Sequence, residues 1–259
     1  MLLADKVCVI TGVGPGLGRA TALACAREGA AVVLVARTES RVQEVAEEIN
    51  AAGGRALAAP ASVTHADQCK RVAELAAKEF GGIDIVVNSA FRSDTFEPFE
   101  AVDFDTWRKI FEVNLFGAMH MTRACLPALR KRGKGSVVMI ASMSARKVRP
   151  NEGGYSASKG ALLTATKTLA LELAPDQIRV NAVVPGWIWG PNVRIYVEWQ
   201  TQSRGITSDE VIAEITEAIP LGEIPPQEDI AEAVVFFASD RSRMITGQSL
   251  DVNGGEYLG

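Results

Sequence analysis

Apolar and polar positions along the chain follow two alternating patterns. Short runs of consecutive apolar residues, many of them β-branched, are followed by longer segments whose apolar residues recur every three or four positions. The first pattern is typical of buried strands and the second of amphipathic helices. Together they predict strands over 6–11, 31–36, 56–59, 83–88, 136–142, 179–184 and 249–252. They predict helices over 19–28, 39–52, 66–80, 103–131, 154–174 and 228–238.

The regular alternation of strand and helix predicts the topology. Strands that are apolar on both sides, each followed by a helix, are typical of a parallel sheet buried between two helical layers. We therefore predict an α/β chain with a doubly wound Rossmann fold, in which about seven parallel strands are flanked by helices on both faces. Because no repeat or Pro-, Gly- or Ser-rich linker divides the sequence, residues 1–259 are interpreted as one domain.

Residues 186–226 interrupt this alternation. A structureless connection of such length inside a domain is unusual unless it has a function. The segment contains a helical pattern over 208–218, with Ser208 as the expected N-cap. We interpret it as a lid or specificity insert beside the substrate site.

Composition and charge argue against several classes of protein. With 27 Lys and Arg against 31 Asp and Glu, the formal net charge of −4 does not suggest a nucleic-acid partner. Apolar runs end well before about 18 residues, so no membrane span is expected. The first residues lack the pattern of a signal peptide. The four cysteines, at 8, 25, 69 and 125, fit neither a metal site nor a disulfide framework, so we expect a reduced, cytoplasmic protein without a metal.

A glycine-rich turn joins the first predicted strand to the first helix. In such a turn, backbone N–H groups and a helix N-terminus point to one spot and form an anion site. Gly12 and Gly14 are free to adopt positive φ, and Gly18 allows the helix to pack closely on the strand. A turn in this place, between strand and helix, is typical of a dinucleotide-binding loop. We expect cofactor contacts from Thr11, Gly12, Gly14, Gly16, Leu17 and Gly18.

The end of the second strand distinguishes the two nicotinamide dinucleotides. An acidic side chain at this place binds the free 2′-hydroxyl of NAD. The sequence has Ala36-Arg37-Thr38 instead, and an arginine binds a 2′-phosphate through paired hydrogen bonds. NADP(H) is therefore favoured over NAD(H). NAD(H) stays a second possibility, because Arg37 also suits stacking on the adenine.

A tyrosine and a lysine stand four residues apart at the start of the predicted helix 154–174. Residues at this spacing share one helix face, so Tyr155 and Lys159 project together. A phenol with a pKa near ~10 is a weak base at neutral pH, and a neighbouring ammonium lowers that pKa. Ser142 ends the fifth strand, at the sheet edge where ligands bind. The three side chains suit proton transfer at a carbonyl or alcohol oxygen.

With these motifs the chain resembles the short-chain dehydrogenase/reductase family over essentially its whole length. The resemblance implies an NAD(P)-dependent oxidoreductase that interconverts a secondary alcohol and a ketone by hydride transfer. It implies that Tyr155 is the acid/base and that Lys159 lowers the pKa of Tyr155 and holds the cofactor ribose. It further implies that Ser142 positions the substrate oxygen and that Asn114 supports a proton-relay water through a helix irregularity. The matching stretches are TGxxxGxG at 11–18, Asn88-Ser89-Ala90, Asn114 in VNLFG, Ser142, Tyr155-x-x-x-Lys159, Pro185-Gly186 and ITGQSLDVNGG.

The resemblance also implies a homotetramer or homodimer built on helices 103–131 and 154–174. Three positions depart from the family pattern: Phe91 replaces a glycine, Ser62 replaces an aspartate, and the stretch after Gly186 lacks a threonine. We expect Ser62 or Val63 to contact the adenine. The other cofactor contacts that the resemblance implies are Asn88, Ala90, Pro185, Gly186 and the backbone of Ile188.

Two groups of side chains are candidates for the substrate wall. An aromatic cluster in the insert suits a bulky apolar substrate or an anchor for the insert. A basic cluster between Ser142 and Tyr155 suits an anionic substrate or a solvated loop. The clusters are Trp187, Trp189, Tyr196 and Trp199, and Arg146, Lys147 and Arg149.

Two rival functions remain to be weighed against a small-molecule oxidoreductase. One is a catalytically idle dinucleotide-binding regulator or scaffold, which predicts loss of Tyr155 or Lys159, yet both are present. The other is a methyltransferase on a related sheet, against which the glycine spacing and the Tyr/Lys pair argue.

Overall fold

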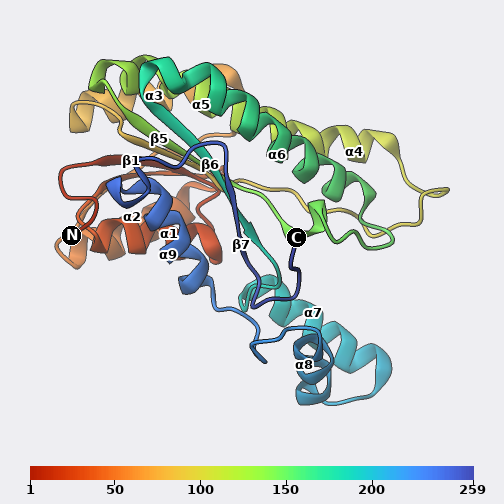
Figure 1. The fold of residues 1–259 in the computed structure, drawn as a ribbon. Coiled ribbons are helices and arrows are strands. Elements are labelled where there is room, and N and C mark those ends of the chain that lie inside the picture. Colours follow the sequence, from red (N-terminus) through yellow and green to blue (C-terminus); the bar gives the residue numbers. More distant parts are fainter.

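A seven-stranded parallel sheet forms the centre of the computed structural model, which describes residues 1–259 (Figure 1). The strand order is β3-β2-β1-β4-β5-β6-β7, and every neighbouring pair is parallel. This confirms the predicted doubly wound fold. The strands are β1 (Val7–Thr11), β2 (Ala31–Val35), β3 (Arg55–Ala58), β4 (Ile85–Asn88), β5 (Gly135–Ile140), β6 (Ile178–Pro185) and β7 (Ser249–Val252).

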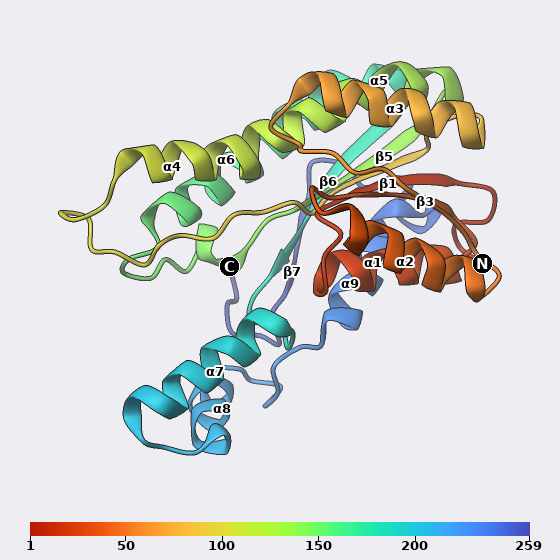
Figure 2. The ribbon, with the colours of Figure 1, turned by 180° about the vertical axis from the view of Figure 1, so that it is seen from behind.

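Helices cover both faces of the sheet, as Figures 1 and 2 show from opposite sides. One face carries α1 (Leu17–Arg27), α2 (Glu39–Ala51) and α9 (Gln227–Ala238). The other carries α3 (Ala66–Phe80), α5 (Gly117–Arg132) and α6 (Gly153–Leu173).

The strands supply apolar side chains to both faces, because successive residues of a strand point to opposite sides. In β1, Cys8 and Ile10 belong to the core under α1 and α9, whereas Val9 belongs to the core under α3 and α5. All four cysteines are buried free thiols in these two cores. Burial raises the pKa of the Cys69 thiol to about 11, as is typical of an unreactive cysteine.

The predicted helix 103–131 is one helical run with a widened turn in its middle. It consists of α4 (Phe104–Phe111), the π-helical turn η1 (Glu112–Phe116) and α5. Such π-turns are often found at functional sites. This one buries Asn114, at the helix irregularity that the family resemblance implies.

The insert lies beyond the carboxyl ends of the strands, apart from the two helical layers (Figure 1). It contains α7 (Pro191–Arg204) and α8 (Ser208–Glu217), which pack through a small apolar core of their own. The predicted helix over 208–218 is present, but its N-cap is Thr207, not Ser208. Thr207 and Glu210 form a reciprocal capping box, so the helix begins one residue earlier than expected. No helix of the chain combines the length and the apolar character that a membrane span needs.

Candidate active site

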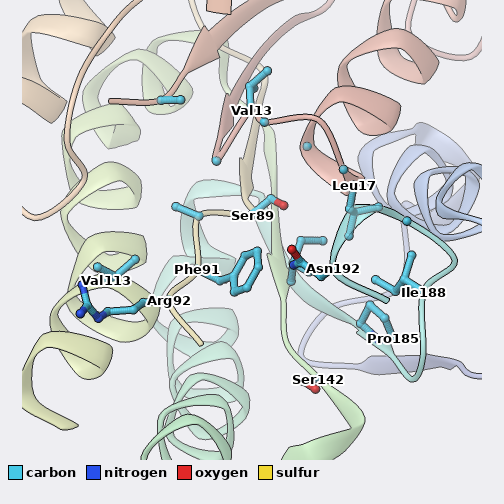
Figure 3. A pocket seen from close by; sticks show the side chains of 18 of the residues that line it. Val13, Leu17, Ser89, Phe91, Arg92, Val113, Ser142, Pro185, Ile188 and Asn192 are labelled. Carbon is cyan, nitrogen blue, oxygen red and sulfur yellow. The ribbon is translucent and has the colours of Figure 1, made fainter. Parts of the chain in front are cut away.

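A cavity of about 970 Å³ runs along the carboxyl ends of the central strands. Side chains from the glycine loop, the ends of β4, β5 and β6, and α7 line it, as Figure 3 shows in part. The predicted residues that line it are Gly12, Gly14, Gly16, Leu17, Gly18, Arg37, Ser62, Val63, Ala90, Ser142, Tyr155, Lys159, Pro185, Gly186 and Ile188. Thr11, Asn88 and Asn114 do not line it.

The glycine loop needs its glycines for close approach of backbone to backbone. Gly12 has φ +75°, and a Cβ there would lie 2.6 Å from the backbone of Ala90. A Cβ on Gly18 would overlap the carbonyl group of Gly12. The expectation for Gly14 was wrong: its φ is not positive and no atom lies within 4 Å of its Cβ position, since it faces the open cavity.

The N-terminus of α1 is free to bind an anion. Its N-cap is Gly16, which has no side chain that caps the first turn. The first N–H groups of a helix lack partners within the helix, and the helix dipole adds positive potential there. Because Gly16 and Leu17 line the cavity, this end of α1 suits a phosphate.

Thr11 and Asn88 support the cavity from behind. Thr11 Oγ1 accepts hydrogen bonds from the N–H groups of Ser89 (3.1 Å) and Ala90 (3.2 Å), so it ties β1 to the turn after β4. Asn88 donates from Nδ2 to Thr122 Oγ1 at 2.9 Å, within the core. Their side chains therefore support the cavity wall, and the direct cofactor contact expected of both residues stays a prediction.

Two arginines line the end of the cavity beside β2. Arg37 follows β2, and Arg41, four residues later in the first turn of α2, lies on the same side; both are exposed. The sequence analysis missed Arg41, because Arg37 precedes α2 and no helical spacing links the two residues. On the opposite wall, Ser62 Oγ is engaged with Thr64 Oγ1 at 2.8 Å, and Val63 lies beside them.

Ser142, Tyr155 and Lys159 converge in the middle of the cavity. Ser142 follows β5 and accepts a hydrogen bond at Oγ from the N–H of Ser144 (3.2 Å). Tyr155 and Lys159 lie on one face of α6, with Lys159 Nζ 5.7 Å from the centre of the Tyr155 ring. Lys159 is 2% exposed and donates from Nζ to the carbonyl oxygen of Ile140 at 2.7 Å.

Burial controls the proton affinities of this pair. It raises the pKa of Tyr155 to about 12, although a hydrogen bond with Ser142 acts in the opposite direction. Burial also lowers the pKa of Lys159 from 10.5 to about 7. The role that the resemblance implies for Lys159, to lower the pKa of Tyr155, concerns the pair beside a bound nicotinamide ring and stays a prediction. Desolvation disfavours the charged forms of both groups.

The backbone of Tyr155 is held by residues far away in the sequence. Asp94, in the loop after β4, is 6% exposed and accepts a hydrogen bond at Oδ2 from the N–H of Tyr155 (2.9 Å). Asp94 thus caps α6, because Glu152 at the N-cap gives no side-chain bond. The sequence analysis missed Asp94, since no local pattern links it to α6.

Asn114 belongs to the same network. Its Oδ1 accepts from the N–H of Arg92 (2.7 Å), and its Nδ2 donates to the Arg92 carbonyl (3.1 Å) and to Ser158 Oγ (2.9 Å). Ser158 in turn donates to the carbonyl of Tyr155 (2.7 Å). The π-turn, the loop after β4 and the first turn of α6 are therefore locked together around Tyr155.

The glycine pair before Tyr155 makes room for a tryptophan. A Cβ on Gly153 or on Gly154 would lie 2.7 Å from the ring of Trp107 on α4. Both glycines are within α6, and neither has positive φ. The pair therefore lets α4 and α6 pack closely at the start of the helix that carries Tyr155.

The basic loop between Ser142 and Tyr155 is tied down by two acidic residues. Arg146 pairs with Asp251 and bonds to Ser249. Lys147 and Arg149 share Glu256. The alternative of a merely solvated loop is wrong, because these ion pairs fix it to β7 and to the C-terminal segment.

Most of the aromatic cluster anchors the insert. The rings of Trp187 and Tyr196 lie 5.3 Å apart, and Trp187, Trp189 and Tyr196 pack on the small core of α7 and α8. Trp199 is 59% exposed. Of the four, Trp187 alone lines the cavity. Phe91, in place of the glycine of related proteins, projects into the cavity toward Asn192 of α7 (Figure 3).

Known proteins share this architecture over almost the whole chain. The family described as enoyl-(acyl carrier protein) reductase matches residues 12–256. An uncharacterized oxidoreductase of Methylorubrum extorquens is 38% identical over 98% of both chains. The 3-oxoacyl-(acyl-carrier-protein) reductase of Thermotoga maritima is 33% identical over 98% of this chain and 99% of its own. L-Sorbose reductase from Gluconobacter frateurii, solved in complex with NADPH and L-sorbose, has 32% identity and a TM-score of 0.94 over 99% of this chain and 98% of its own. The chain belongs to the short-chain dehydrogenase/reductase family and is an NAD(P)-dependent oxidoreductase.

Proposed function

We propose that this enzyme interconverts a ketone and a secondary alcohol, with Tyr155 as the acid/base. The observation that carries the proposal is the convergence of Ser142, Tyr155 and Lys159 in one cavity with the glycine loop. When bound, the nicotinamide cofactor supplies or accepts the hydride. With its pKa raised to about 12, Tyr155 is a neutral phenol at pH 7, which suits proton donation to a carbonyl oxygen.

The residues of the chain handle the proton. Tyr155 Oη donates to the substrate oxygen as that oxygen gains negative charge, and Ser142 Oγ hydrogen-bonds the same oxygen. The phenolate that Tyr155 becomes is stabilised by the ammonium of Lys159, which also holds the ribose. Asn114 supports the relay that returns a proton to Lys159. The network of Asn114, Arg92 and Ser158 keeps Tyr155 in place.

The cavity fits a dinucleotide, and we propose NADP(H) as the preferred one. Gly12 and Gly18 hold the loop tightly against the neighbouring backbone, and Gly14 borders open space in the cavity near the start of α1, where the phosphates would lie. Arg37 and Arg41 would bind a 2′-phosphate through charge-assisted hydrogen bonds. The L-sorbose reductase structure, with its NADPH, supports this preference. The remaining contacts would come from Ser62, Val63, Ala90, Pro185, Gly186 and Ile188, with Thr11 and Asn88 as support from behind.

We also propose a single catalytic domain over 1–259, whose insert at 186–226 forms one wall of the substrate site. The substrate is a small molecule, and Trp187 and Phe91 suit one with an apolar body. A cytoplasmic location agrees with four reduced cysteines.

Exposed apolar side chains on the α4–α6 layer, Phe104 (51%), Phe116 (46%) and Leu171 (79%), support a homotetramer or homodimer. Light scattering tests the assembly, and a monomer at micromolar concentration would contradict it.

Cofactor oxidation in the presence of a panel of ketones tests the proposed function. We expect turnover with NADPH to exceed turnover with NADH. Arg37→Ala should weaken NADPH binding by about tenfold, since a charged hydrogen bond contributes about 1.5–3 kcal/mol, and should leave NADH binding nearly unchanged. No turnover with any ketone would overturn the reaction type. Equal loss of both cofactors in the variant would overturn the role of Arg37.

A further inference from the structure

Arg149 is a cation of the cavity wall that has no role in the reaction proposed above. Arg149 lines the cavity, in the loop between Ser142 and Tyr155. Its guanidinium lies over the ring of Trp187, 4.5 Å from the ring centre. Trp187 also lines the cavity and directly follows Gly186. The pair therefore joins the loops after β5 and β6, on the substrate side of Ser142.

The position of Arg149 is set by the C-terminal segment. One of its terminal nitrogens lies 3.3 Å from Oε1 of Glu256, whose side chain is 2% exposed. Lys147 Nζ lies 3.2 Å from the same oxygen. One carboxylate shared by two cations leaves the group with a net positive charge. A guanidinium has five N–H donors, and the bond to Glu256 engages one nitrogen.

Stacking leaves the remaining donors available. An arginine placed over an aromatic ring keeps N–H groups free beside it, where they match the two oxygens of a carboxylate. The side chain of Arg149 is 34% exposed, so it reaches the cavity without being fully solvated. A cation held in this way loses less conformational entropy on binding than a free one.

The other cations of the cavity wall lie elsewhere. Arg92 extends toward Val113 and away from Ser142 (Figure 3). Lys109 is an exposed residue of α4, and Arg37 and Arg41 belong to the end beside β2. Arg149 is the cation that is anchored next to the substrate half.

We propose that Arg149 determines specificity by binding a carboxylate of the substrate, so that the enzyme acts on keto acids and the corresponding hydroxy acids. The inference rests on the proposed function, because it concerns the same cavity and the same reaction. Trp187 contacts the carbon chain between the carboxylate and the ketone, and Ser142 and Tyr155 bind the ketone oxygen. The separation of the two groups in the preferred substrate then follows from the distance between Arg149 and Tyr155.

A series of straight-chain keto carboxylates, each paired with its neutral methyl ester, tests the proposal. We expect the wild-type enzyme to prefer one or two acids of the series over their esters by at least tenfold in kcat/KM, mainly through KM. Arg149→Gln should remove this preference while leaving the activity on esters and the Kd of NADPH within twofold. Lys147→Gln is the matched control: it removes one positive charge and one partner of Glu256 from the same loop, but Lys147 does not line the cavity. It should keep the preference.

Three results would contradict the proposal in distinguishable ways. Equal activity of the wild-type enzyme on acids and esters would overturn the role of Arg149 and leave the proposed function standing. An equal loss of preference in both variants would show that the charge of the loop matters and not contact with Arg149. If the enzyme reduces no ketone at all, the proposed function itself fails and the carboxylate assignment with it.

Discussion

The two halves of the cavity are built in different ways. The half that faces β1, β2 and β4 is shaped by backbone, at glycines where a Cβ would overlap the neighbouring chain. The half beyond β5 and β6 is shaped by side chains such as Arg149 and Trp187, which come from segments far apart in the sequence, and Glu256 holds Arg149 from outside the cavity wall. Tyr155 and Lys159 lie at the boundary. The difference predicts that substitutions in the substrate half will change specificity without disturbing the half that we propose for the cofactor.

The largest effect is expected in the backbone half. Gly12→Ala would put a Cβ 2.6 Å from the backbone of Ala90 at a residue with φ +75°, so we expect a loss of about 3 kcal/mol or more in the free energy of unfolding. NADPH binding should be lost as well. Urea denaturation and fluorescence titration measure both effects. Gly14→Ala is the control, because its Cβ meets no atom within 4 Å and stability should change by less than about 0.5 kcal/mol.

Lys159, at the boundary between the halves, should make the free energy of unfolding depend on pH. Because the pKa of Lys159 is lowered from 10.5 to about 7, the unfolded chain binds more protons than the folded one between these values. The destabilisation that the buried Lys159 causes therefore decreases as the pH rises, by up to about 1.4 kcal/mol of unfolding free energy per pH unit. Tyr155, with its pKa raised to about 12, acts in the opposite direction only above pH 10.

Lys159→Met removes the contribution of the lysine and isolates it. The difference in unfolding free energy between the wild-type protein and the variant should rise between pH 7 and pH 9, by about 2 kcal/mol in all. Chemical denaturation at a series of pH values measures it. A difference that stays constant or falls with pH would show that burial does not lower the pKa of Lys159.

A smaller effect is expected from the cap that holds Tyr155. Asp94→Ala removes the acceptor of the Tyr155 N–H and should cost about 1–2 kcal/mol of stability. Because a small displacement of a catalytic group slows the chemical step, kcat should fall about tenfold or more while the Kd of NADPH stays unchanged. Asp94→Asn keeps an acceptor oxygen and should restore most of kcat. Equal activity of both variants and the wild-type protein would show that the cap does not position Tyr155.

Local patterns were sufficient to predict the sheet and much of the cavity wall. The alternation of apolar runs and helical periods predicts all seven strands and the helices that cover them, because each pattern is read within a single element. The glycine loop and the Tyr155/Lys159 pair are equally local, since four residues on a helix or a strand-to-helix turn already define their geometry. The structure brings Ser142 to that pair because the carboxyl ends of parallel strands share one edge of the sheet.

The features that escaped prediction depend on contacts between distant residues. Asp94 and Tyr155 are 61 positions apart, and Lys147 and Glu256 are 109 apart. Helix α7 was missed because Ile195 and Trp199 are exposed and blur the helical period, so that packing on α8 defines it instead. The high pKa of Tyr155 results from burial, which no sequence spacing reports.

The direct test of the central claim is turnover by Tyr155→Phe with NADPH and a ketone that the wild-type enzyme reduces. Removal of the proton donor should lower kcat by about 10²- to 10⁴-fold, while the Kd of NADPH stays within twofold. Tyr196→Phe is the matched control, because its hydroxyl bonds only to Gln200 within the insert, and it should keep wild-type turnover. Turnover by Tyr155→Phe above a tenth of the wild-type rate would contradict the account.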